Sequence, residues 1–120
     1  MFTMISPHKA LEYFETKLEF TLGPHELNEL IKRSEVNVID VRAEKDYKQG
    51  HIPEAINLPE GKWVTLEGLN YDRTNVIYCY GITCFLATRA CRRFAENGYP
   101  VMELIGGFEE WKKNNMPVKR

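Results

Sequence analysis

The stretch Asn75-Val76-Ile77-Tyr78-Cys79-Tyr80-Gly81-Ile82-Thr83-Cys84 contains the pattern that decides the fold. Residues 75–79 form a short run of mainly apolar and aromatic side chains, which is typical of a buried strand in a parallel sheet. A glycine-containing loop follows, and apolar side chains at helical spacing run from about Cys84 to Glu96. Asn97-Gly98 is a helix stop signal. A strand, a tight loop and a helix in this order predict one unit of an α/β domain.

The flanking sequence repeats this alternation. Further apolar runs fit strands at residues 36–41, 55–58 and 101–105, and a weaker one lies at 19–22. Helical patterns occupy residues 6–18, the segment after Gly23-Pro24, residues 43–49 and residues 107–114. We therefore predict a single α/β domain in which helices cover both faces of a parallel sheet.

Length and composition exclude several classes of protein. A chain of 120 residues with 43% hydrophobic and 28% charged side chains suits one ordinary globular domain. Its longest apolar runs are far short of the ~20 residues of a membrane span, and residues 1–10 lack the features of a signal peptide. The net charge of −1 argues against a dedicated nucleic-acid binder. We expect a cytoplasmic protein that has neither membrane nor nucleic acid as a partner.

Three cysteines lie within 13 residues of one another, at Cys79, Cys84 and Cys91. An odd number of cysteines so close together does not suit a disulfide framework. A zinc site is also disfavoured, because there is no Cys-x-x-Cys pair and the histidines lie far upstream in the sequence. The sequence therefore indicates no metal and no cofactor, and leaves open which cysteine is reactive.

Cys79 is the first candidate for a reactive thiol. Ligands of open parallel sheets bind outside the carboxyl ends of the strands, and Cys79 closes such a strand. The loop and the helix start after it would present backbone N–H groups, which should stabilise a thiolate and lower the pKa of Cys79. The alternative is that Cys79 is a small apolar residue at the end of a strand.

Three motifs in this sequence resemble those of a single-domain rhodanese, a member of the sulfurtransferase family. The first motif comprises residues 38–42 with Glu44, Tyr47, residues 50–53 and residues 55–59. The second is Val76-Ile77-Tyr78-Cys79 with its loop and helix. The third is Leu104-Ile105-Gly106-Gly107-Phe108-Glu109-Glu110-Trp111. Their order and spacing match the family over about residues 20–118.

The resemblance implies a rhodanese-like α/β fold with a central five-stranded parallel sheet flanked by helices. Residues 20–120 would form this domain, and residues 1–19 would be a helical extension. Cys79 would carry a persulfide, held by the backbone of Tyr80, Gly81, Ile82, Thr83, Cys84 and Phe85. The implied partners are a sulfane-sulfur donor, which includes a protein persulfide, and a thiol or cyanide-like acceptor. We expect a monomer or a weak dimer.

One departure from the family concerns the loop. Many active rhodaneses place Arg or Lys near the fifth position after the cysteine, where this chain has Cys84, and residues 80–85 contain no cation. This absence argues against thiosulfate as the favoured donor and for a persulfide or another sulfane sulfur.

The remaining candidates each have two interpretations. Cys84 is either a resolving thiol that attacks the Cys79 persulfide or a residue packed at the base of the loop. Cys91 falls on the apolar stripe of its helix, which favours a core position. Asp40 and Arg42, at the end of the neighbouring strand, would support the loops through hydrogen bonds and an ion pair, with attraction of anions by Arg42 as the alternative.

Two other functions compete with sulfur transfer. A Cys-based phosphatase needs an arginine about six residues after the cysteine, and this chain has Phe85 there. The other alternative is a non-catalytic rhodanese-fold module that binds a protein or senses redox state through Cys79 and Cys84.

Overall fold

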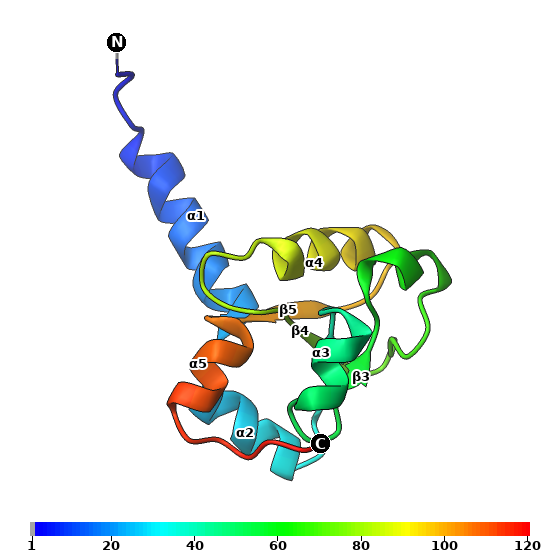
Figure 1. The fold of residues 1–120 in the computed structure, drawn as a ribbon. Helices are drawn as coiled ribbons and strands as arrows, with labels where there is room; N and C mark the ends of the chain where they lie inside the picture. The colour runs from blue at the N-terminus through cyan, green and yellow to red at the C-terminus, as the bar shows by residue number, and fades with distance from the viewer. Residues whose placement is uncertain (1) are drawn as a thin grey trace.

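The computed structural model describes residues 2–120, which fold as an α/β domain (Figure 1). The strands are β1 (Thr21–Leu22), β2 (Val36–Asp40), β3 (Ile56–Asn57), β4 (Thr74–Tyr78) and β5 (Val101–Leu104). The helices are α1 (Pro7–Phe20), α2 (Pro24–Lys32), α3 (Glu44–Gln49), α4 (Leu86–Glu96) and α5 (Gly107–Lys113), with a 3-10 helix, η1 (Glu60–Thr65).

All five strands join one parallel sheet in the order β1-β5-β4-β2-β3. The five-stranded parallel sheet predicted from the sequence is therefore confirmed. The central strand β4 pairs with β2 in a register that places Asp40 opposite Tyr78. The residues that follow these two strands consequently meet at the same edge of the sheet, where ligands of such sheets bind.

Helices cover both faces of the sheet, as predicted (Figure 1). Tyr78 faces one core, which contains side chains of α2 and α5 such as Leu27 and Trp111. Cys79 faces the other core, with Phe94 of α4 and Trp63 of η1. Because successive side chains of a strand point to opposite faces, the alternation along β4 directs Cys79 towards α4.

The helix after β4 begins later than the sequence predicts. It starts at Leu86, two residues beyond the expected start at Cys84. The backbone N–H of Cys84 donates to the carbonyl of Gly81, 3.1 Å away, so residues 81–84 form a turn. Cys84 therefore lies in the loop. The 3-10 helix η1 was not predicted, and it is anchored by Trp63, whose indole N–H donates to the carbonyl of Leu58 over 2.9 Å.

Helix α1 projects from the rest of the molecule (Figure 1). Ser6 caps this helix, because its side chain accepts a hydrogen bond from the backbone N–H of Lys9. The helix buries no side chain, and its apolar stripe, which includes Leu11, Phe14 and Leu18, is exposed. Within residues 2–120, every helix is too short or too polar to cross a membrane.

Because α1 buries no side chain, removing residues 1–19 should change the free energy of unfolding by less than about 0.5 kcal/mol, as for other surface changes. Chemical denaturation of the chain that begins at Phe20 would measure this. A loss of more than about 2 kcal/mol would show that the extension is part of the folding unit and not an addition to it.

Candidate active site

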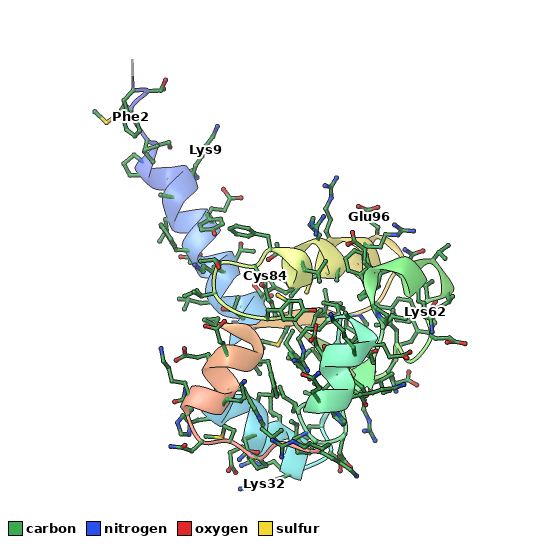
Figure 2. The ribbon with its side chains drawn as sticks, viewed as in Figure 1. Phe2, Lys9, Lys32, Lys62, Cys84 and Glu96 are labelled. Atoms are coloured by element: carbon green, nitrogen blue, oxygen red, sulfur yellow. The ribbon has the colours of Figure 1, made fainter. Side chains whose placement is uncertain are left out.

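Cys79 is the first residue after β4 and lies at the carboxyl edge of the sheet. Its side chain is 3% exposed. The thiol donates to the backbone carbonyl of Cys84, with 3.6 Å between sulfur and oxygen. Figure 2 shows Cys84 in the loop that leads into α4. The turn through Gly81 therefore folds the second cysteine back towards the first.

The N-terminus of α5 holds this loop in place. Its backbone N–H groups at Phe108 and Glu109 donate to the carbonyls of Cys79 and Tyr80, over 2.9 and 3.0 Å. Gly107 has a φ of 58°, and a Cβ there would lie 2.7 Å from the carbonyl oxygen of Cys79 and 2.9 Å from the nitrogen of Gly81. A glycine is thus required for the backbones of α5 and the loop to approach so closely.

A second anchor fixes Tyr80. Its hydroxyl donates to Asp46 over 2.6 Å and accepts a hydrogen bond from the backbone N–H of Ala43 over 3.1 Å. Both partners belong to the segment that follows β2. The loop after the central strand is therefore tied to the loop after its neighbour.

The middle of the loop is exposed, and its nearest charge is negative. Ile82 and Phe85 are 77% and 70% exposed, and Thr83 is exposed as well. Gly81 is buried against the Glu109 side chain, and a Cβ there would come within 2.6 Å of its carboxylate. A carboxylate next to the loop disfavours a small dianion at this position.

Asp40 and Arg42 form a buried ion pair beside the site. The Arg42 guanidinium lies 2.7 Å from the Asp40 carboxylate and 2.7 Å from the carbonyl oxygen of Gly50, to which it also donates. The Tyr78 hydroxyl donates to the same carboxylate over 2.5 Å. Burial works to lower the pKa of Arg42, but the hydrogen bond and charge of Asp40, together with Tyr78, outweigh it and raise that pKa. The pair thus ties β2, β4 and the segment after α3 together.

The expectation of a lowered pKa at Cys79 is wrong. Burial, aided by the neighbouring Cys84 thiol, raises the pKa of Cys79 to about 11, although backbone N–H groups of Ala87 and Tyr80 act in the opposite direction. Partial burial also works to raise the pKa of Cys84. There the Leu86 N–H, the Cys79 thiol and the Arg89 charge prevail and lower it.

Burial explains this reversal. The first N–H groups of α4 favour negative charge at both thiols, Leu86 at Cys84 and Ala87 at Cys79, but the burial of Cys79 outweighs them and the partial burial of Cys84 does not. The two thiols titrate as a pair in which negative charge is favoured more at Cys84 than at Cys79. The sequence alone cannot assign this role, because it depends on how deeply each thiol is buried.

Cys91 is separate from this pair. Its thiol faces the carbonyl of Met102 at 3.8 Å, and it packs against the core on the α4 side of the sheet. Burial, together with the charge of Glu103, raises the pKa of Cys91 strongly. A thiol in this setting is protonated at neutral pH and unreactive.

An apolar groove of about 600 Å³ runs beside the loop. Its walls come from α1, α4, β5 and the loop, and they include Tyr13, Phe20, Cys84, Phe85 and Met102. Cys84 therefore borders open space, whereas Cys79 is buried. Among residues 2–120, no three His, Cys, Asp or Glu side chains are grouped so that they could bind a metal ion.

Comparison with known proteins agrees with this geometry. The sequence pattern of the Rhodanese-like domain family matches residues 23–114. The thiosulfate sulfurtransferase GlpE of Coxiella burnetii is 32% identical over 90 residues, which are 72% of this chain and 81% of that protein. The HTH-type transcriptional regulator Rv0324 of Mycobacterium tuberculosis is 39% identical over 94 residues, which are 75% of this chain but only 42% of the regulator.

Solved structures show the same fold. The BH2092 protein from Bacillus halodurans is 36% identical and superposes with a TM-score of 0.83, covering 95% of this chain and 86% of that one. A five-stranded parallel sheet covered by helices on both faces, with a cysteine directly after its central strand, places the chain in the class of α/β domains. Within that class, this chain belongs to the rhodanese-like domain family.

The close approach of the two backbones at Gly107 predicts that a side chain there destabilises the fold. A non-glycine residue with a left-handed backbone costs about 1–2 kcal/mol. Gly107→Ala should lower the free energy of unfolding by more than this, because the added Cβ also collides with the carbonyl oxygen of Cys79. Gly98→Ala is the matched control, since Gly98 also has a positive φ, of 87°, and no atom lies within 4 Å of a Cβ there. Thermal denaturation of both variants measures the difference, and equal melting temperatures would contradict the role of Gly107.

The opposite pKa shifts of the two thiols predict the order in which the cysteines are alkylated. Thiolates are the reactive form, so Cys84 should be alkylated by iodoacetamide before Cys79 at neutral pH. The alkylation rate of Cys84 should rise with pH, and the midpoint of this rise should lie at a pKa below that of an ordinary cysteine. Cys79→Ala should move this rise to higher pH because the S–H donor is lost, and Cys79→Ser should move it less. Faster labelling of Cys79 in the unsubstituted chain would refute the assignment.

Proposed function

We propose that this chain is a sulfurtransferase that carries sulfane sulfur as a persulfide on Cys79. The observation that carries this proposal is the placement of Cys79, which directly follows the central strand in a loop held by α5. The family match and the similarity to a protein named thiosulfate sulfurtransferase support the same reaction class. The donor and the mechanism are inferred from the residues around Cys79.

The first half-reaction loads the persulfide. Cys79 Sγ attacks the terminal sulfur of a donor persulfide, and the Cys84 thiolate accepts the Cys79 proton. The S–S bond of the donor breaks, and its thiolate leaves with the electron pair. In the second half-reaction an acceptor thiol attacks the terminal sulfur and regenerates Cys79, which completes a ping-pong cycle. Cys84 acts as the base that a buried thiol with a raised pKa requires.

The surroundings of the loop favour a particular donor. Residues 80–85 contain no cation, and the Glu109 carboxylate lies against Gly81. The groove at Cys84 is mainly apolar. A low-molecular-weight or protein persulfide suits this site better than a small dianion such as thiosulfate.

Redox sensing through Cys79 and Cys84 is the second candidate function, because the two thiols are in contact. One relative is named a transcriptional regulator, in which such a domain occupies less than half of the chain. A chain that forms a Cys79–Cys84 disulfide with an oxidant, but takes sulfur from no donor, would favour this function over sulfur transfer.

Intact-mass analysis tests the transferase proposal. After exposure to glutathione persulfide, Cys84→Ser, which lacks the second thiol of the loop, should gain one sulfur atom, and Cys79→Ser should gain none. Cys91→Ser is the matched control and should load as the unsubstituted chain does, since Cys91 lies outside the pair. Thiosulfate should load more slowly than the persulfide. Equal loading of Cys79→Ser would exclude Cys79 as the carrier.

A further inference from the structure

We propose that Cys84 cleaves the Cys79 persulfide, so that the site releases sulfide and closes a Cys79–Cys84 disulfide. This inference rests on the proposed function, because it begins from the loaded Cys79. It changes the outcome of the reaction, since sulfane sulfur then leaves as sulfide and is not passed on to an acceptor. The site becomes a persulfide reductase that uses a thiol as the final reductant.

The loop geometry brings Cys84 back against the Cys79 sulfur. The turn closed by the Cys84 N–H and the Gly81 carbonyl, 3.1 Å apart, reverses the chain after Cys79. The Cys79 sulfur then lies 3.6 Å from the carbonyl oxygen of Cys84. Because α5 binds the carbonyls of Cys79 and Tyr80, the base of this turn is fixed. A cysteine in such a short, anchored loop reacts with its neighbour at a high effective concentration.

The step balances without an external oxidant. The Cys84 thiol formed during loading gives its proton to the departing donor thiolate. The resulting Cys84 thiolate attacks Cys79 Sγ, the inner sulfur of the persulfide. The bond between Cys79 Sγ and the terminal sulfur breaks, and that sulfur leaves as hydrosulfide with the electron pair. The two cysteines are oxidised to a disulfide, and the sulfane sulfur is reduced. Attack by the thiolate form at a sulfur–sulfur bond is ordinary thiol–disulfide chemistry.

Burial favours this internal step over transfer to an outside acceptor. Cys79 is 3% exposed, so an acceptor must open the site to reach its persulfide. Cys84 is already in contact with it. The neighbouring Leu86 N–H and Arg89 charge lower the pKa of Cys84, which favours its thiolate form.

The groove determines how the disulfide is reopened. Cys84 lines the groove of about 600 Å³, so an incoming thiol meets the Cys84 sulfur first. That thiol forms a mixed disulfide with Cys84 and releases Cys79 as a thiol. A second thiol equivalent frees Cys84 and completes the cycle. The required co-reactant is therefore a dithiol or two monothiols.

A single-turnover experiment tests the proposal. The reduced chain is treated with polysulfide under anaerobic conditions, freed of excess reagent, and incubated without a thiol. Released sulfide and the state of the cysteines are then measured. Both cysteines fall in one tryptic peptide, residues 74–89, in which a disulfide appears as the loss of two hydrogens and of reactivity towards iodoacetamide.

The unsubstituted chain should release one sulfide per chain and show the disulfide. Cys84→Ser should load more slowly but keep its persulfide, with sulfide release reduced at least about tenfold. Cys91→Ser should behave as the unsubstituted chain. A stable persulfide on Cys79 in the unsubstituted chain, with no disulfide, would overturn the inference. Failure of the proposed function is distinct: Cys84→Ser would then acquire no sulfur at all, or Cys79→Ser would acquire it.

Discussion

The site depends on the contact between the start of α5 and the loop after β4. Two backbone N–H groups of α5 bind the carbonyls of Cys79 and Tyr80, and this requires Gly107 where a side chain would collide with the loop. The contact joins the C-terminal motif to the cysteine motif. It also explains why the glycine pair and the cysteine, about 27 residues apart in the chain, form one structural unit.

Much of the fold was predictable from the sequence because it follows from local periodicity. The runs that became β2, β4 and β5 are short and apolar, and α4 has a clear stripe with a stop signal. The loop itself was also predictable, since it lies at the carboxyl end of a central strand. By contrast η1 has no such pattern. It depends on a tertiary contact, the insertion of Trp63 beneath α4 and its bond to Leu58.

The electrostatics of the site could not be predicted in the same way. The sequence places Cys79 near a helix start but does not give the burial of each thiol. That burial decides which of the two thiols favours negative charge. Likewise Asp46 carries no motif, and only the fold brings it to the hydroxyl of Tyr80. Both features depend on tertiary packing, which the local sequence pattern does not specify.

Helix α1 forms a wall of the groove that is less firmly packed than the rest of the site. The sheet and the loop are held by two buried cores, whereas α1 contributes Tyr13 and Phe20 to the groove without burying any side chain. Segments with few buried apolar contacts open locally at low free energy and exchange their amide hydrogens fastest. The cysteine loop thus belongs to the part of the molecule that the buried cores hold, whereas one wall of the groove is the helix whose amide hydrogens we expect to exchange fastest.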